Sequence, residues 1–164
     1  MKDRRVELMT RGTLQNLFKV LEQSEKEKAQ ALKSIGESAR PGDWHDNFAL
    51  EQAHRDSYLA GKILEMVQKM LQQDKIEIIK PVQDTEVVRI GNRVEIQYLD
   101  EPNTEIYTIG GPADRIYNTG FISYQSPIGQ AALGRKAGEV VEVRINDQST
   151  VAIKIVKILP SNFD

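Results

Sequence analysis

Two long segments with a helical pattern, separated by a short polar turn, constrain this chain most strongly. From Thr10 to Ala39 apolar residues recur every three or four positions, and a second such segment begins at Asp43. Pro41-Gly42 between them is a strong helix stop, and Thr10 is a suitable N-cap for the first helix. Because only a few residues join the segments, we expect two antiparallel helices that bury their apolar faces against each other.

The apolar face of each segment is narrow. The residues expected on it are Leu14, Leu17, Phe18, Leu21, Ala31, Leu32, Ile35 and Ala39 in the first segment, and Phe48, Ala49, Ala53, Leu59, Ile63, Met66, Val67, Met70 and Leu71 in the second. The first face is interrupted between Ser24 and Lys28, where helix propensity stays high. The pattern predicts a thin, solvated coiled coil. At about 1.5 Å per residue, ~28 residues give a rod on the order of 40 Å.

After Lys75 the pattern changes from helical to strand-like. Strands are predicted at 76–79, 87–90, 93–98, 105–109, 140–145 and 151–158, the last two forming a hairpin about Asn146-Asp147. Ser126 as N-cap and Pro127 at the first helical position predict a short helix over 128–133. The expected fold class is α+β, with a coiled-coil hairpin over 1–75 and a curved antiparallel sheet carrying one helix over 76–164.

Composition narrows the possible functions. The 164 residues include no cysteine, which excludes disulfides, thiolate metal sites and a thiol nucleophile. No apolar run is long enough to cross a bilayer, so we expect no membrane partner. The composition fits a cytoplasmic location, and we expect a monomer. The net charge of −2 argues against a general polyanion binder, so any contact with nucleic acid would be local.

The turn between the helices carries two carboxylates, Asp43 and Asp46. A rod can bring such charges to a place that the rest of a protein cannot enter. Carboxylate oxygens suit Mg²⁺, which keeps several of its waters and is often bound by only one or two protein carboxylates. On the residues alone, the commoner role is structural, because Asp43 is a good N-cap and Asp46 stands three residues later, as in a capping box.

Three stretches together resemble the bacterial transcript-cleavage factors of the GreA/GreB type. Met9-Thr10 resembles the family's opening, and Gly42-Asp43 with Asp46-Asn47 resembles its tip. The most specific stretch runs from Ile122 to Gly138 and contains Ser126-Pro127-Ile128-Gly129, Leu133-Gly134 and Lys136. The resemblance covers nearly the whole chain, and it implies an N-terminal coiled coil joined to a C-terminal FKBP-like domain.

The resemblance also implies a function. The C-terminal domain, through Ser126, Pro127 and Ile128, would dock at the rim of the secondary channel of bacterial RNA polymerase. The coiled coil would enter the channel, and Asp43 and Asp46 would help to hold a Mg²⁺ that the protein does not bind alone. The polymerase would then hydrolyse backtracked RNA near its 3′ end, so this protein would be an accessory factor and no enzyme itself.

Further residues near the tip are expected to lie close to the nascent RNA. They are Arg40, Trp44, Asn47 and Arg55. Arg40 and Arg55, with Lys33, Lys62 and Lys69, would form a basic strip for the RNA. The alternative is a solvated face of ion pairs with Glu37, Glu51 and Glu65. For Trp44 the alternative is a hydrophobic staple against Phe48. His45 and His54 are interpreted as solvated helix residues, because nothing places a third metal ligand near them.

The tip departs from the family pattern, and this leaves alternatives open. Asp46 replaces the usual Glu and shortens the reach by one methylene, roughly 1.5 Å. Phe48-Ala49-Leu50 stands where the family commonly has Ala-Glu-Tyr, and Trp44 replaces Leu. One hypothesis is therefore a cleavage factor, and another is a channel-binding regulator that does not promote cleavage. A third, a prolyl isomerase, would need an aromatic-lined pocket, for which this half offers no Trp and only two Phe.

Overall fold

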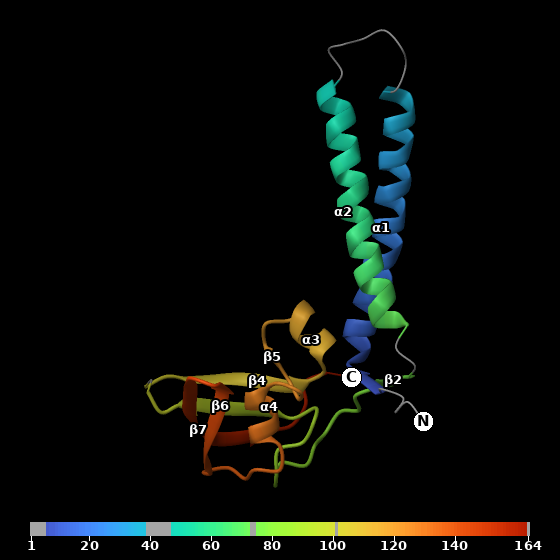
Figure 1. Cartoon of the computed structure of the whole chain (residues 1–164). Coiled ribbons are helices and arrows are strands. Elements are labelled where there is room, and N and C mark those ends of the chain that lie inside the picture. Colours follow the sequence, from blue (N-terminus) through green and yellow to red (C-terminus); the bar gives the residue numbers. More distant parts are fainter. Residues whose placement is uncertain (1–5, 39–46, 73–74, 101, 164) are drawn as a thin grey trace, which may run out of the picture. The chain divides into compact units, whose positions relative to one another are not determined.

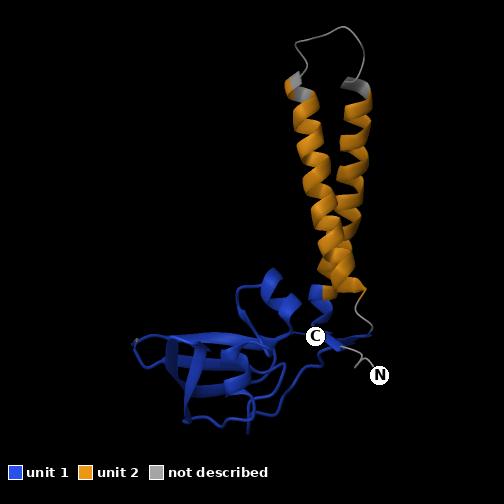
Figure 2. Cartoon of the chain, in the orientation of Figure 1, with its two compact units in different colours: residues 1–13, 74–164 blue, residues 14–73 orange. Residues whose placement is uncertain are grey.

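In a computed structural model, residues 6–38, 47–72, 75–100 and 102–163 are described. They form an α+β protein with a helical hairpin and a mixed sheet, which confirms the expected fold class (Figure 1). The chain divides into two compact units, one of residues 14–73 and one of residues 1–13 with 74–164 (Figure 2). The second unit includes the start of the chain, which the sequence had assigned to the coiled coil.

Residues 1–13 belong with the C-terminal residues because of a strand that the sequence pattern did not reveal. Strand β1 (Val6–Met9) pairs in parallel with β2 (Lys75–Ile78). The pairing extends beyond the strands, since the Ile79 N–H donates to the Met9 carbonyl at 2.9 Å. Met9 is fully buried. With only four residues, β1 is too short for its alternation to stand out in a sequence.

The helical hairpin consists of α1 (Arg11–Ser38) and α2 (Asn47–Leu71). Thr10 caps α1 as expected, because its hydroxyl accepts a hydrogen bond from the Thr13 N–H at 3.3 Å. The two helices run side by side in Figure 1, and both bury a seam with a seven-residue period. This period is that of a coiled coil, as predicted.

The seam contains only some of the residues expected on it. The most buried positions are Leu17, Ser24 and Ala31 in α1 and Ala53, Ala60 and Val67 in α2. A second set, three residues before each of these, is half-buried: Leu14, Leu21, Lys28, Leu50, Ser57 and Leu64. Phe18, Leu32, Phe48, Leu59, Ile63 and Met66 were expected at the interface, but they are exposed. Four of the six most buried positions therefore hold Ser or Ala, Leu17 and Val67 fill the other two, and several of the largest apolar side chains lie outside the seam.

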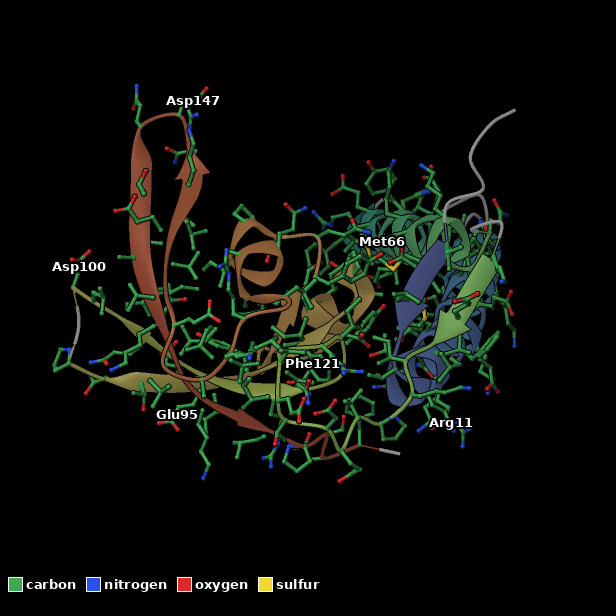
Figure 3. The ribbon with its side chains drawn as sticks, turned by 90° about the horizontal axis from the view of Figure 1, so that it is seen from below. Arg11, Met66, Glu95, Asp100, Phe121 and Asp147 are labelled. Carbon is green, nitrogen blue, oxygen red and sulfur yellow. The ribbon has the colours of Figure 1, made fainter. Side chains whose placement is uncertain are left out.

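A five-stranded sheet forms the larger part of the other unit. Its strand order is β5-β4-β3-β7-β6, with β3 (Arg93–Tyr98), β4 (Thr104–Gly110), β5 (Phe121–Ser123), β6 (Val140–Asn146) and β7 (Ser149–Leu159). All neighbours are antiparallel except β4 and β5, so the sheet is mixed rather than purely antiparallel. The predicted hairpin is confirmed as β6–β7, with Asp147 at its tip (Figure 3).

Two local predictions in this sheet unit are wrong. Residues 87–90 form no strand; Val88 is buried there and exchanges hydrogen bonds with Gly134 and Arg135 instead. Besides the expected helix, α4 (Pro127–Ala132), there is a second one, α3 (Pro112–Tyr117), although only one helix was predicted in this part of the chain. Pro112 is the first residue of α3, a position in which a missing N–H costs nothing.

The sheet unit has a continuous apolar core. Val94, Ile96, Ile109, Ile153 and Ile155 are fully buried in it. Ala132 of α4 belongs to the same cluster, so α4 covers this face of the sheet. Glu95, between Val94 and Ile96, points to the opposite face (Figure 3).

Candidate functional site

The loop that leads into α4 is held by a dense set of hydrogen bonds. The Ser126 hydroxyl donates to the Ser123 carbonyl at 2.7 Å and accepts from the Gly129 N–H at 3.1 Å. Ser126 is thus the N-cap and Pro127 the first residue of the helix, as predicted. A side chain on Gly129 would lie 2.1 Å from the Ser123 carbonyl oxygen. Only glycine fits there, and this close approach holds the loop against the end of β5.

A groove runs along α4 beside the edge strand β6. It has a volume of about 410 Å³. Its lining residues are Gln125, Pro127, Gln130 and Ala131 from the loop and α4, and Glu142, Val143 and Arg144 from β6. Sequence reasoning found Pro127 but missed the contribution of β6. No local signal could have shown it, because β6 reaches this place only through the strand order of the sheet.

Ile128 is less accessible than the sequence suggested. It was expected to be an exposed apolar anchor, but it is half-buried and packs against the sheet core. Pro127 beside it is exposed. The loop therefore leaves Pro127, Gln125 and Gln130 exposed to solvent, and Ile128 serves mainly to fix the helix on the sheet.

The other candidate site, at the end of the hairpin, lies mostly outside the described residues. This applies to Arg40, Asp43, Trp44, His45 and Asp46, and to the side chain of Asn47. The structure does describe the helices on both sides, with α1 ending at Ser38 and α2 beginning at Asn47. Phe48, in the first turn of α2, is 74% exposed. Among the described residues, no cluster of three or more acidic or His side chains could hold a metal ion.

The basic residues of the hairpin that the structure describes are partly engaged with acids. Lys69 pairs with Glu65 at 2.9 Å, and Lys62 approaches the same carboxylate at 3.8 Å. The hydrogen bond from Lys69 lowers the pKa of Glu65. Arg55 is exposed and donates to the Gln52 side chain at 3.3 Å. For Lys62 and Lys69 this favours the solvated face of ion pairs, whereas Arg55 pairs with no acid among these contacts.

A buried carboxylate, Asp114, lies between α3 and the beginning of α1. It is fully buried and accepts hydrogen bonds from the Thr10 N–H at 2.9 Å, the Thr10 hydroxyl at 2.8 Å and the Gly111 N–H at 2.8 Å. A side chain on Gly111 would lie 1.7 Å from the Leu8 carbonyl oxygen. Thr10 is therefore both the cap of α1 and the partner of Asp114. The sequence pattern did not single out Asp114.

Comparison with known proteins gives the family of this chain. The family model "Transcription elongation factor, GreA/GreB, C-term" matches residues 83–160. The transcription elongation factor GreA of Thermomicrobium roseum is 32% identical over 133 residues, which are 80% of this chain and 82% of that protein. GreA of Clostridioides difficile strain 630 is 34% identical over 134 residues, 82% of this chain and 80% of that protein. The chain belongs to the GreA/GreB family of transcription elongation factors.

The family assignment confirms the resemblance inferred from the motifs. The matched region contains the α4 loop and the groove beside it. Among solved structures, the GreA factor homolog 1 (Gfh1) of Thermus thermophilus aligns with 94% of this GreA/GreB family chain and 99% of its own, at 22% identity and a TM-score of 0.42. No helix within the described ranges is long and apolar enough to cross a membrane.

Proposed function

We propose that this GreA/GreB family member binds bacterial RNA polymerase through the secondary channel and stimulates Mg²⁺-dependent cleavage of backtracked RNA. The observation that carries the proposal is the position of two carboxylates, Asp43 and Asp46, in the short connection between α1 and α2. They stand where the family has its acidic tip. The hairpin supports this use because its narrow seam keeps it thin.

The proposed chemical role of the tip is limited to holding a metal ion. Asp43 and Asp46 would hold a Mg²⁺ together with acids of the polymerase, and the ion would supply an activated water or stabilise the leaving oxygen. The protein itself would position charge and would not react. We therefore propose that it is an accessory factor, with Mg²⁺ bound only in the complex.

The α4 loop is the proposed docking surface on the polymerase. Its support is the rigidity that the Ser126 and Gly129 contacts give it, since a preorganised surface loses less entropy on binding. Pro127 is its exposed apolar residue. Arg144 and Glu142, across the groove, add one charge of each sign. A polar rim of this kind sets orientation more than affinity.

A second candidate function is a channel-binding regulator that does not promote cleavage. The sequence observation that favours it is the change at the tip, where the shorter Asp46 replaces Glu and Phe48-Ala49-Leu50 replaces Ala-Glu-Tyr. An acid and an aromatic hydroxyl are thereby lost close to the proposed Mg²⁺ site. The exposed Phe48 would instead present a large apolar group to the polymerase.

Stalled elongation complexes distinguish the two functions. They are incubated with the protein over a range of Mg²⁺ concentrations, and the RNA products are resolved by length. We expect shortened RNA with the wild type, a strong loss with Asp43→Asn and Asp46→Asn at limiting Mg²⁺, and partial recovery at high Mg²⁺. Both variants should still compete with the wild type for the polymerase. A wild type that binds and slows elongation, without shortening RNA at any Mg²⁺ concentration, would support the regulator instead.

Docking is tested separately with an exposed residue of the α4 loop. Pro127→Arg changes the surface at a helix position that tolerates most residues, so folding should be kept. The matched control is Pro81→Arg, because Pro81 is also exposed on the sheet unit but lies outside the groove. We expect weaker polymerase binding for the first variant only. Equal binding of the two variants would contradict the docking assignment.

A further inference from the structure

The hairpin has an open groove between its two helices on one side of the seam. The groove has a volume of about 880 Å³. Its lining residues are Glu27, Gln30, Ala31 and Ser34 from α1 and Phe48, Gln52, Ala53, Asp56, Leu59, Ala60 and Ile63 from α2. From Phe48 to Ile63 a helix rises on the order of 22 Å, about four turns. This is the length of a short helix rather than of a small molecule.

The floor of this hairpin groove is formed by small residues. Ala31, Ala53 and Ala60 are all buried in the seam, and each leaves room that a larger side chain would fill. Because these three floor residues are small, a groove remains between the helices at their level, whereas Leu17 and Val67 fill other positions of the seam.

One wall of the groove is a row of exposed large apolar side chains. Phe48 is 74% exposed, and Leu59 and Ile63 are also exposed. Met66, which does not line the groove, is also exposed and follows Ile63 by about one turn of α2. Gln52 and Asp56 separate Phe48 from Leu59 along this wall, so the apolar side chains that follow one another from turn to turn are Leu59, Ile63 and, beyond the groove, Met66. Exposed apolar surface of this kind marks a place that a partner covers. The spacing of 59, 63 and 66 matches the steps of three and four by which one helix packs against another.

The charged groups that line the groove have one sign. Among the lining residues that the structure describes, only Glu27 and Asp56 are charged, and each accepts a hydrogen bond from a neutral glutamine, Gln23 and Gln52 respectively, at 2.8 Å. Neither carboxylate is paired with a cation in these contacts. An occupant with Lys or Arg beside its apolar residues would therefore meet complementary charge on both walls.

We infer that the hairpin groove binds an amphipathic helix of RNA polymerase whose apolar stripe is flanked by basic residues. The proposal rests on the proposed function for the identity of the partner. It adds a second contact surface, on the hairpin, to the α4 loop. The contact would hold the hairpin in one rotational setting about its own axis inside the channel, which a smooth rod could not achieve.

The test measures the affinity of the full chain for purified RNA polymerase core enzyme. Leu59→Gln removes an apolar wall residue that is 58% exposed, and Leu32→Gln is the matched control, because Leu32 is 54% exposed on α1 and lies outside the groove. We expect Leu59→Gln to weaken binding about tenfold and Leu32→Gln less than about twofold. Circular dichroism verifies that both variants keep their helicity. Equal affinity of Leu59→Gln and the wild type overturns the inference.

A second measurement identifies the occupant. A photoreactive phenylalanine analogue replaces Gln52 in the groove, and the cross-linked peptide is sequenced from the complex. We expect a helical polymerase segment with Lys or Arg beside its apolar residues. Cross-links to RNA only, or to a second copy of this chain, overturn the inference. If the wild type does not bind the polymerase at all, the proposed function itself fails; if it binds and only the groove variants behave as wild type, the proposed function stands.

Discussion

The sheet unit and the hairpin bury their residues in different ways. The sheet core is made of large β-branched side chains, such as Ile96, Ile109 and Ile155, all fully buried. The hairpin seam buries Leu17 and Val67, but its other most buried positions are the small residues Ser24, Ala31, Ala53 and Ala60, and larger residues such as Leu59 stay outside. Burial of apolar area is the main favourable term in folding, so a seam of small residues contributes less per position. Burial in the sheet unit therefore contributes more to stability at each position. The hairpin stays thin and leaves large apolar side chains exposed to solvent.

The largest expected effect tests the sheet side of this comparison. Ile155→Ala removes three methyl or methylene groups from the centre of the core, so we expect the free energy of unfolding to fall by about 3–4 kcal/mol. Urea denaturation of the full chain measures it. The control is Ile106→Ala in the same sheet, since Ile106 is half exposed, with an expected loss below about 1 kcal/mol. Equal losses would mean that the core is not tightly packed.

Variants of Asp114 test whether the stability of the sheet unit also depends on a buried, hydrogen-bonded carboxylate. Asp114→Ala leaves the Thr10 and Gly111 N–H groups without their acceptor, so we expect the free energy of unfolding to fall by about 3 kcal/mol. Asp114→Asn keeps an oxygen for Thr10 but brings an amide donor to the Gly111 N–H, and its cost should be intermediate. Hydrogen exchange of the Thr10 and Gly111 amides checks the mechanism. If Asp114→Ala leaves the exchange protection of these two amides unchanged, their hydrogen bonds to Asp114 do not stabilise this part of the structure.

The hairpin side is tested by two seam residues. Val67→Ala removes two buried methyl groups. We expect it to lower the free energy of unfolding by about 2 kcal/mol, which is less than the effect of Ile155→Ala. Ser24→Ala should be neutral or stabilise by up to about 0.5 kcal/mol, because alanine has the higher helix propensity and Ser24 lies in a seam of small residues. Hydrogen exchange of the α2 amides measures both effects within the hairpin. A costly Ser24→Ala would show that the seam depends on its hydroxyl.

The comparison also explains which parts of the structure could be predicted from the sequence. The helical hairpin, the Thr10 cap, the Ser126-Pro127 helix start and the β6–β7 hairpin follow from local patterns, and all are confirmed. The seam was harder, because pattern reading favours the largest apolar residues. Leu59 and Ile63 were therefore wrongly placed inside and Ala60 was missed, whereas Ala53 and Val67 were predicted correctly.

Features that depend on distant segments were missed for a different reason. β1 is a strand only because β2 lies beside it, and Asp114 is recognisable as a buried acid only once Thr10 approaches it. Glu142 and Arg144 join the groove beside α4 through the strand order alone. The tip residues Asp43 and Asp46 were singled out by their place in the polar turn between the helical segments, and the family motif suggested their role, which stays a prediction.

The smallest expected effect concerns two glutamates of the sheet unit with opposite pKa shifts. Burial raises the pKa of Glu7, and the negative charge of Asp114 adds to the shift. The folded protein therefore binds this proton more tightly than the unfolded chain, and stability falls as pH rises from the usual value of 4.5 through the folded-state pKa. At pH 7 Glu7 is ionised in the folded protein, and the resulting loss of stability has reached its full size. Glu7→Gln should raise Tm there by about 1–2 °C, and the gain should disappear near pH 4.

Glu139 gives the matched case of opposite sign. Its carboxylate accepts the Lys136 N–H at 2.9 Å, and this hydrogen bond, with Arg135 nearby, lowers its pKa. The ionised Glu139 stabilises the folded protein at pH values above the usual pKa of 4.5, and this stabilisation is lost as pH falls through the folded-state pKa. Glu139→Gln should therefore lower Tm at pH 7 and lose this effect in acid. Melting curves of both variants from pH 4 to 8 should diverge from the wild type in opposite directions as pH rises. If Glu7→Gln also lowers Tm at pH 7, the Glu7 carboxylate is stabilised by a partner, and its burial beside Asp114 is not the dominant influence.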